Sequence, residues 1–298
     1  MGKKKTEDFP GAAYGFTHPV SSVLRAGRGF SLQDADPGAK PGFPGSKSDG
    51  RKALAAADGR LDELQERLYA QARGGDDPTR VLLVLQAMDT AGKGGIVRHV
   101  IGSVDPQGVQ LHAFKAPTPA EKRHDFLWRI ERRLPGAGMI GVFDRSHYED
   151  VLIGSVRSLA RPEEIERRLE AIRGFEQRLA DEGTHIIKVM LNISPEEQYQ
   201  RLAERLDRAD KHWKFNPGDI DERELWDDYM QAYQRAIRAT DADHAPWYVV
   251  PANRKWYARL AVQHLLLETL AGIDPQWPAA DFDVEAQRER LKKARDIG

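Results

Sequence analysis

The sequence contains no cysteine. This excludes disulfide bonds, metal sites built from thiolates and catalysis by a cysteine nucleophile, and it is compatible with a reducing compartment. Long apolar segments are also missing: runs such as VLLVL and HLLL are far shorter than the roughly 20 residues that span a bilayer. No apolar signal sequence follows the start of the chain. We therefore expect a soluble, cytoplasmic protein with no membrane partner.

An excess of charge of one sign is absent as well. Charged residues make up 31% of the 298 residues, yet the net charge is −1. A protein that coats nucleic acid needs a general basic excess, so we expect no nucleic-acid partner. Any polyanionic ligand must bind at a local cluster of basic side chains.

Composition divides the chain into three parts. Residues 1–50 are rich in Gly, Pro, Ser and Asp and have few apolar residues at regular spacing, which predicts an extended or mobile N-terminal arm. Leucines at helical spacing begin near residue 51. We predict a single domain over residues 51–275, with a lid at about 201–225, and a C-terminal tail over 276–298.

Short apolar runs alternate with amphipathic segments along the predicted domain. Strands are expected at 81–85, 109–114, 139–143, 185–193 and 247–251. Helices are expected from 51 to 68, from 96 to 101, and over 120–134, 162–181, 194–206 and 256–270. This alternation predicts an α/β fold with a parallel sheet flanked by helices. In such folds, ligands bind beyond the carboxyl ends of the strands.

The segment DTAGKGG, residues 89–95, follows the first predicted strand. It departs from the phosphate-loop pattern G-x-x-x-x-G-K-[ST], because Ala87 replaces the first glycine and Gly94 replaces the magnesium-binding hydroxyl. A turn between a buried strand and a helix directs backbone N–H groups and one ammonium at a single point. An ordinary surface turn is the alternative. The predicted phosphate-binding residues are Ala91, Gly92, Lys93, Gly94 and Gly95.

Two aspartates can replace the missing hydroxyl. Asp89 lies four residues before Lys93, and Asp144 directly follows the strand predicted at 139–143. Magnesium prefers oxygen ligands, and a strand-end aspartate beside a phosphate loop is a typical metal ligand. We therefore predict that both residues bind Mg²⁺, with Mn²⁺ as an alternative. A turn or helix-capping role is the other interpretation of Asp144.

Further polar residues lie at the same predicted strand ends. Arg145 can donate two hydrogen bonds to a phosphate, although a structural salt bridge is its alternative role. Glu149 follows in the same segment, and Lys115 ends another predicted strand. We expect Lys115, Asp144, Arg145 and Glu149 to contact a nucleotide, and His147 to be a hydrogen-bonding support.

A basic segment follows the helix predicted at 194–206. On a helix, Arg201, Arg205 and Arg208 fall within about 60° of one another and form a ridge. Lys211 and Lys214 lie just before a helix-breaking Asn-Pro-Gly. This pattern predicts a basic lid over the phosphate site. A solvated helix face, neutralised by the acidic residues of the same segment, is the alternative.

Several long blocks resemble the polyphosphate kinase 2 family, in the correct order over roughly residues 30–270. The blocks are QAMDTAGKGG, FKAPT, FDRSHYEDVL, RLAERLDRADKHWKF, LWDDYMQAY and APWYVVPANRKWY. The first and third are most similar to class III, whose members accept both AMP and ADP. The resemblance implies a P-loop kinase fold, similar to thymidylate kinase, with a helical basic lid.

The resemblance also implies an activity, which is the Mg²⁺-dependent, reversible transfer of a terminal phosphoryl group between inorganic polyphosphate and AMP or ADP. The residues that match the family's catalytic residues are Asp89, Lys93, Asp144, Arg145 and Arg205. Those that match its polyphosphate-binding lid are Arg208, Lys211 and Lys214. The implied partners are polyphosphate, adenine nucleotides with guanine nucleotides as an alternative, and further copies of the chain in a homodimer or homotetramer.

Two other functions remain open from the sequence. An ATP-dependent nucleotide kinase of the thymidylate kinase type would share the loop, but it does not need so long a basic lid. A non-catalytic polyphosphate-binding protein would not need Lys93 together with Asp89 and Asp144. The preference for AMP or ADP and the favoured direction of transfer are not encoded in any of these motifs.

Overall fold

The computed structural model describes residues 9–75 and 77–295. Within them, five parallel strands form one sheet in the order β2-β3-β1-β4-β5. The strands are β1 (Arg80–Gln86), β2 (Val109–Ala113), β3 (Ile140–Asp144), β4 (Thr184–Asn192) and β5 (Trp247–Pro251). The predicted strands and the predicted α/β class are thereby confirmed. No helix in these two described ranges has the length and apolar character needed to cross a membrane.

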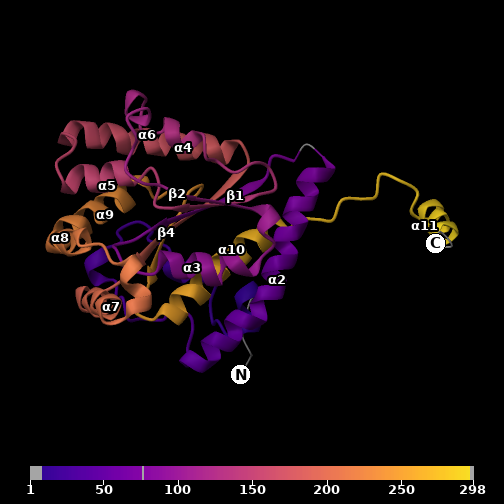
Figure 1. Cartoon of the computed structure of the whole chain (residues 1–298), viewed down its shortest axis with the longest axis horizontal. Coiled ribbons are helices and arrows are strands. Elements are labelled where there is room, and N and C mark those ends of the chain that lie inside the picture. Colours follow the sequence, from indigo (N-terminus) through magenta and orange to yellow (C-terminus); the bar gives the residue numbers. More distant parts are fainter. Residues whose placement is uncertain (1–8, 76, 296–298) are drawn as a thin grey trace, which may run out of the picture.

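Helices cover both faces of the sheet (Figure 1). The helices are α1 (Val20–Leu24), α2 (Lys47–Gly74), α3 (Lys93–His99), α4 (Trp128–Glu131), α5 (Glu149–Val156), α6 (Pro162–Asp181), α7 (Pro195–Asp207), α8 (Gly218–Glu224), α9 (Trp226–Thr240), α10 (Lys255–Ile273) and α11 (Val284–Ala294). Residues of α1, α2, α3 and α10 form one buried cluster, and residues of α5, α6 and α9 form the other.

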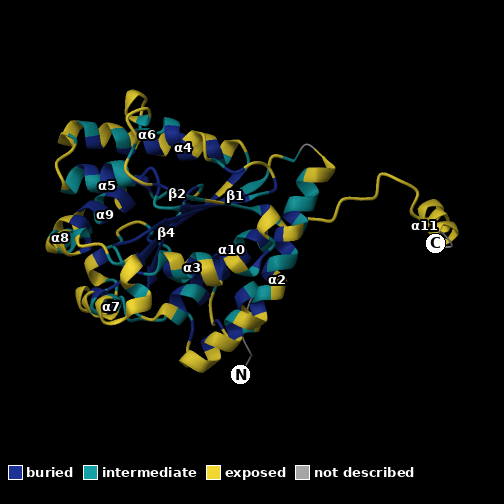
Figure 2. Cartoon of the chain, in the orientation of Figure 1, coloured by how far each residue is buried: buried dark blue, intermediate teal, exposed yellow. Residues whose placement is uncertain are grey.

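The two clusters exist because side chains alternate across a strand. Val81, Leu83 and Leu85 of β1 belong to the cluster beneath α2 and α10, whereas Leu82 and Val84 belong to the cluster beneath α6 and α9. β1 is therefore buried on both faces, as Figure 2 shows by its dark colour in the centre of the molecule. This central strand carries the predicted phosphate loop at its carboxyl end.

The helix predicted over residues 120–134 is wrong. The structure has only a short 3-10 helix at Glu121–Arg123 and the four-residue α4. His124 is extended between them, with φ −114° and ψ 166°. The side chain of Asp125 then accepts a hydrogen bond from Leu127 N at 3.1 Å and starts a separate turn. Local hydrogen bonding by a short polar side chain therefore overrides the helical spacing of the apolar residues.

The segment before α2 contains α1 and two short 3-10 helices, and it packs on the core. Phe16, Val20, Leu24 and Phe43 are all buried in the cluster that contains α10. The backbone of this segment is also tied to the sheet, because Asn192 Nδ2 donates to the Ala35 carbonyl at 3.0 Å. α2 begins slightly before the predicted boundary at residue 51, and the first eight residues of the predicted arm lie outside the described residues.

Candidate active site

The predicted phosphate loop joins β1 to α3. Gly92 has φ 125°, a conformation that side chains rarely adopt, and Thr90 has φ 64°. These angles turn the chain so that α3 begins at Lys93, whose Nζ donates to the Ala87 carbonyl at 3.1 Å. A Cβ built on Gly94 would meet nothing within 4 Å. The backbone at Gly94 is therefore open to a ligand, which suits a phosphate at the N-terminus of the helix.

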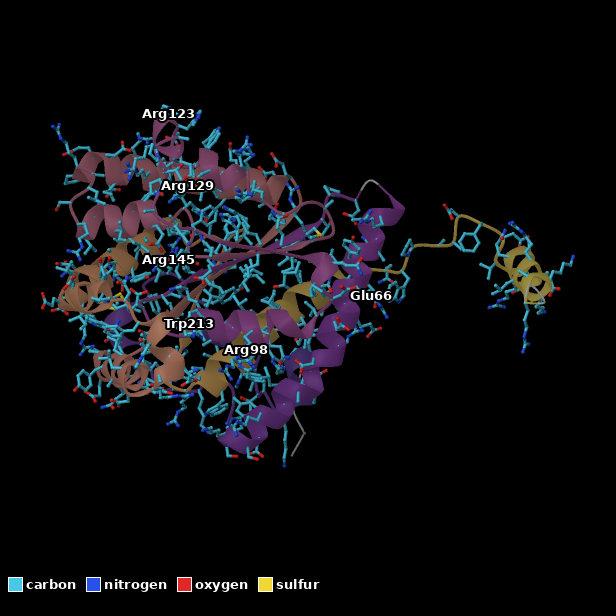
Figure 3. All side chains as sticks on the ribbon, in the orientation of Figure 1. Glu66, Arg98, Arg123, Arg129, Arg145 and Trp213 are labelled. Carbon is cyan, nitrogen blue, oxygen red and sulfur yellow. The ribbon has the colours of Figure 1, made fainter. Side chains whose placement is uncertain are left out.

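Asp144 and Arg145 lie beside this loop. Asp144 ends β3 opposite Leu85 of β1, and the Arg145 N–H donates to the Leu85 carbonyl at 3.1 Å. Arg145 adopts φ 64°, and its Nη2 donates to Asp89 Oδ1 at 3.3 Å. Figure 3 labels Arg145 in this region, where side chains from several elements converge. The structure thus brings Asp89, Asp144 and Arg145 together at the carboxyl ends of β1 and β3, as the sequence predicts.

Carboxylates dominate the electrostatics around Arg145. Burial alone would lower the pKa of Arg145, but Glu149, Asp89 and Asp144 raise it above its usual value. Burial in turn raises the pKa of Glu149, although Arg145 opposes this shift. Glu149 therefore lies within the site, as the sequence predicts. A cation placed among these carboxylates would be stabilised by them.

The residues present fit a magnesium ion that is held jointly by protein and substrate. Among residues 9–75 and 77–295, no three histidine or acidic side chains converge into a complete metal cage. Asp89 and Asp144 can supply two carboxylate ligands. Magnesium is usually bound in this way, by one or two carboxylates with waters and substrate phosphates.

A buried network anchors the segment that follows Arg145. His147 Nε2 lies 3.2 Å from Glu176 Oε1, and the Tyr148 hydroxyl donates to the same oxygen at 2.8 Å. Lys188 Nζ of β4 donates to Glu176 Oε2 at 2.6 Å. Burial alone would raise the pKa of Glu176, but Lys188 and His147 lower it. The predicted supporting role of His147 is therefore confirmed, and the network fixes the backbone next to Arg145.

The predicted ridge of three arginines is wrong. Arg201 is only 5% exposed, and its Nη1 donates to the carbonyls of Thr90 and Ala91 at 3.0 and 2.7 Å. α7 therefore turns this face towards the phosphate loop, and Arg201 holds the loop in place. Arg208 has left the helix, with φ −113° and ψ 112°. Helical spacing alone therefore predicts the position of neither Arg201 nor Arg208 correctly.

Arg205 bonds to other residues of the lid rather than to the phosphate loop. Its Nη1 donates to Asp219 Oδ2 of α8 at 3.1 Å and to the Lys214 carbonyl at 3.0 Å. Arg208 pairs with acidic neighbours and is exposed, and the Lys214 ammonium lies 4.8 Å from the centre of the Trp213 ring. Lys211 is half-buried, 3.8 Å from a carboxylate oxygen of Asp210. These contacts separate Arg205 from the outer basic residues of the lid.

A cavity of about 220 Å³ lies between the loop and the lid. Among the residues that line it are Ala87, Asp89, Arg145, Glu149, Asn216, Asp219, Glu222, Tyr229 and Tyr233. The sequence did not predict the last five of these as site residues. An acidic residue directly after a helix-breaking Asn-Pro-Gly was the available signal for Asp219. Lys115 is exposed and does not line this cavity.

Asp219 gives the site a pH dependence. Burial and the nearby Asp89 raise the pKa of Asp219 to about 6, although Arg205 opposes the shift. Between the unfolded and folded pKa values, the folded protein holds a proton that the unfolded chain has lost, so the stability due to Asp219 falls as pH rises. We expect the free energy of unfolding of the wild type, minus that of Asp219→Asn, to decrease from about pH 4.5 to pH 7. Urea titrations at both pH values measure it, and a difference that stays constant contradicts the assignment.

A second pocket, of about 460 Å³, adjoins the start of α3 and is strongly basic. Its cationic lining residues are Lys47, Arg51, Arg254, Lys255 and Arg259. A Cβ built on Gly95 would lie 3.5 Å from Arg259 Nη2, so Arg259, which lines this pocket, also lies beside the phosphate loop. Burial lowers the pKa of Arg259, and the positive charges of Arg51 and Arg201 lower it further. The sequence motifs did not predict this pocket, because its residues come from separate segments.

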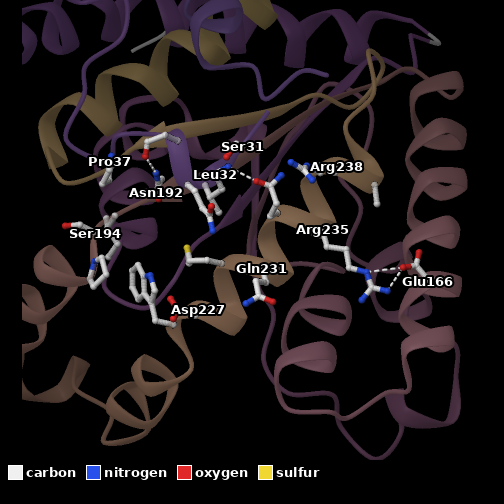
Figure 4. Close-up of a pocket in the computed structure, with 18 residues that line it drawn as sticks. Ser31, Leu32, Pro37, Glu166, Asn192, Ser194, Asp227, Gln231, Arg235 and Arg238 are labelled. Carbon is white, nitrogen blue, oxygen red and sulfur yellow. Dashed lines mark hydrogen bonds and ion pairs between the residues drawn. The ribbon is translucent and has the colours of Figure 1, made fainter. Parts of the chain in front are cut away.

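A cleft of about 1190 Å³ contains none of the predicted site residues. Residues 31–37, the end of β4 and helix α9 line it (Figure 4). Some of its polar side chains are already engaged: Gln234 Oε1 accepts from Leu32 N at 2.6 Å, and Arg235 pairs with Glu166. The hydrogen bond from Leu32 holds residues 31–37 against α9, and we assign the cleft no ligand.

Comparison with known proteins gives consistent results. Residues 45–278 match the family model described as polyphosphate kinase 2. The chain is 47% identical over 249 residues to an AMP/ADP-polyphosphate phosphotransferase of Meiothermus ruber, covering 84% of this chain and 91% of that protein. It is 42% identical over 248 residues to an ADP-polyphosphate phosphotransferase of Rhodopseudomonas palustris, covering 79% and 83%.

A solved structure agrees with these relatives. The crystal structure of polyphosphate kinase 2 from Arthrobacter aurescens is 59% identical in sequence and superimposes with a TM-score of 0.91, covering 93% of this chain and 98% of that one. The fold is therefore that of a P-loop kinase. On the extent of these matches, the chain belongs to the polyphosphate kinase 2 family.

Proposed function

We propose that the chain is a polyphosphate:nucleotide phosphotransferase, which moves a terminal phosphoryl group reversibly between inorganic polyphosphate and AMP or ADP. The names of its relatives support this activity. The observation that carries it is the juxtaposition of two sites at one phosphate loop. The cavity beneath the lid lies on one side, and the basic pocket around Arg259 adjoins the start of α3. This arrangement suits a nucleotide on one side and a polyanion on the other.

Positioning and charge stabilisation account for the proposed catalysis. The transferred phosphoryl group lies over the N–H groups of Gly92 to Gly95, where Lys93 and Arg145 donate to its oxygens. A phosphate oxygen of the nucleotide attacks phosphorus, and the bond to the bridging oxygen of polyphosphate breaks. Asp89 and Asp144 would hold Mg²⁺, or Mn²⁺ in its place, and the bound ion would supply positive charge to the phosphate oxygens. Lid closure brings Arg205 to the same oxygens and excludes water.

The basic pocket is the proposed path of the polyphosphate chain. Phosphate groups beyond the loop would meet Arg259 first and then the other basic side chains of the pocket. Arg208, Lys211 and Lys214 remain proposed contacts at the rim of the lid. Lys115 is exposed beyond β2, so a contact with the nucleotide requires movement of this segment.

The Arg259→Ala variant tests this path. We expect KM for long-chain polyphosphate to rise about tenfold, which corresponds to about 1.4 kcal/mol, with KM for ADP changed less than about twofold. Steady-state kinetics with each substrate varied in turn measures both constants. Arg60→Ala is the matched control, since Arg60 lies on α2 outside the pocket. An increase confined to the KM for ADP would place Arg259 at the nucleotide instead.

One assay separates the three candidate functions. AMP or ADP is incubated with long-chain polyphosphate and magnesium, and the formation of ADP and ATP is followed. Product from polyphosphate supports the proposal. Product formed only when ATP is the donor would identify an ATP-dependent nucleotide kinase of the thymidylate kinase type. Polyphosphate binding without turnover of either donor would identify a non-catalytic binding protein.

We propose that the chain consists of an N-terminal arm over residues 1–50, a kinase domain over residues 51–275 and a C-terminal tail over residues 276–298. We propose a cytoplasmic enzyme that acts on adenine or guanine nucleotides and forms a homodimer or homotetramer, with no nucleic-acid or membrane partner.

A further inference from the structure

The C-terminal helix α11 is separate from the body of the protein (Figure 1). The last contacts of the chain with the body come before it: Gln276 N donates to Gln71 Oε1 at 2.7 Å, and Arg67 lies 5.8 Å from the centre of the Trp277 ring. All residues of α11 are exposed. The helix also lies beyond residues 45–278, which match the family model. No part of the proposed catalytic site involves it.

An isolated helix of this length is marginally stable in water, because helices shorter than about 12 to 15 residues do not offset the cost of nucleation. α11 has 11 residues. Its internal contacts are few: Asp283 caps the N-terminus at 3.0 Å, and Arg288 and Lys292 form ion pairs with Glu285 and Glu289. Each such pair stabilises an isolated helix only slightly. A stable α11 therefore requires an apolar partner.

α11 presents two large apolar side chains to such a partner. Val284 and Leu291 are seven residues apart and so lie on the same side of the helix. Gln287 and Arg288 lie between them on that side, and Phe282 lies two residues before the helix begins. Val284, Leu291 and Phe282 are 40%, 74% and 55% exposed, respectively. These exposed side chains are the feature that a partner must cover.

The charges of the segment are strongly polarised. The residues at its N-terminal end are acidic: Asp281, Asp283 and Glu285. The residues at its C-terminal end are basic: Arg290, Lys292, Lys293 and Arg295. If a second copy of this segment lies antiparallel to the first, the acidic end of each copy lies beside the basic end of the other. If the second copy lies parallel, ends of like charge lie side by side.

We propose that α11 pairs in an antiparallel orientation with α11 of a second copy of this chain. In this pairing, Val284 of each copy packs against Leu291 of the other. Lys292 and Arg295 face the acidic residues of the opposite N-terminal end. The same surface is used on both chains, as in the two-fold interfaces that are common among homo-oligomers. The charge pattern is what selects a second copy rather than an unrelated partner.

The surface buried by this pairing is small, which limits what the pairing can do. A stable dimer usually buries at least about 1,200 Å² of surface, which two such short helices cannot reach. α11 therefore strengthens one step of self-association instead of forming a dimer by itself. The step is independent of catalysis, so kcat at saturating substrates should not depend on it.

Charge reversal on the full-length chain tests the proposal. One variant carries Lys292→Glu and Arg295→Glu, and the other carries Asp281→Lys and Glu285→Lys. Asp283 is kept because it caps the helix. Sedimentation velocity over a wide range of protein concentration measures self-association. We expect each variant alone to associate at least about tenfold more weakly than the wild type, and an equimolar mixture of the two to recover wild-type association.

The mixture separates pairing from a general effect of the substitutions. Both variants weaken the isolated helix through its dipole, and this effect would persist in the mixture. Association that stays weak in the mixture, or variants that associate like the wild type, would overturn the proposal. A chain that ends at Pro278 is the second test: it should lose the same association step. Unchanged association with a lower melting temperature would show that α11 folds onto its own body, which also overturns the proposal.

Discussion

The variant Asp89→Asn is expected to lower kcat by about 10²- to 10³-fold, the range typical for loss of one charge-stabilising group in an active site. Asp89 is the only carboxylate within the phosphate loop and lies 3.3 Å from Arg145 Nη2. Asparagine preserves the shape of the side chain but removes its negative charge. The variant therefore loses a proposed magnesium ligand and releases Arg145 from its ion pair.

The dependence on magnesium distinguishes these two effects. If Asp89 binds the metal, the loss of activity should be largest at limiting magnesium and should decrease as magnesium is raised, because a missing ligand weakens metal affinity. Initial rates over a magnesium titration measure this response. Asp228→Asn is the control, since Asp228 is exposed on α9 away from the loop. Near-normal turnover of Asp89→Asn at limiting magnesium would rule out the metal assignment.

The variant Arg205→Ala is expected to lose at least about 10³-fold in kcat, because arginines that stabilise a transferring phosphoryl group contribute 10³ to 10⁵. In the structure, Arg205 is held by the Lys214 carbonyl and by Asp219, which itself lines the cavity beneath the lid. The ion pair is partly exposed, so its loss should change stability by only about 1 kcal/mol. The melting temperature should therefore change little while turnover is lost.

Arg208→Ala is the matched control for this prediction. Arg208 lies three residues away in the same lid, but it is exposed and forms its ion pairs with Glu204 and Asp210. Loss of an exposed arginine of this kind should lower kcat by no more than a few fold. Any larger effect should be confined to the KM for polyphosphate. Equal and small losses in the two variants would return Arg205 to a structural role. Single-turnover measurements would show whether the chemical step is the one affected.

Much of the fold could be predicted from local patterns. The apolar run at 81–85 is short and continuous, as expected for a strand buried on both faces, and it became β1. Pro162 and Ser194–Pro195 mark helix starts by local chemistry, and α6 and α7 begin there. The prediction of one helix over residues 120–134 was wrong because hydrogen bonding by a short polar side chain also acts within this segment. Asp125 starts a new turn and divides the predicted helix.

The candidate site was predictable where one segment carries the chemistry. The loop from Asp89 to Gly95 is one contiguous segment, and the strand end at Asp144 and Arg145 is another. β1 and β3, which carry these two segments, are neighbours in the sheet. The basic pocket was not predictable in this way. Its residues come from α2, from the end of β5 and from α10, and they form one surface only when these elements pack together.

The sequence by itself determined the strand pattern, the phosphate loop, the strand-end carboxylates and the family, because these depend on residues that are close in the chain. Tertiary structure alone decided which arginine of the lid faces the site. Arg201, Arg205 and Arg208 have similar helical phase, yet Arg201 binds the loop carbonyls, Arg205 pairs with Asp219 and Arg208 points to solvent. The physical reason is that the role of a guanidinium depends on the acceptors that packing brings within hydrogen-bond distance. Those of Arg201 lie 51 to 111 residues away in the chain, and Asp219, which pairs with Arg205, lies on a separate helix, α8.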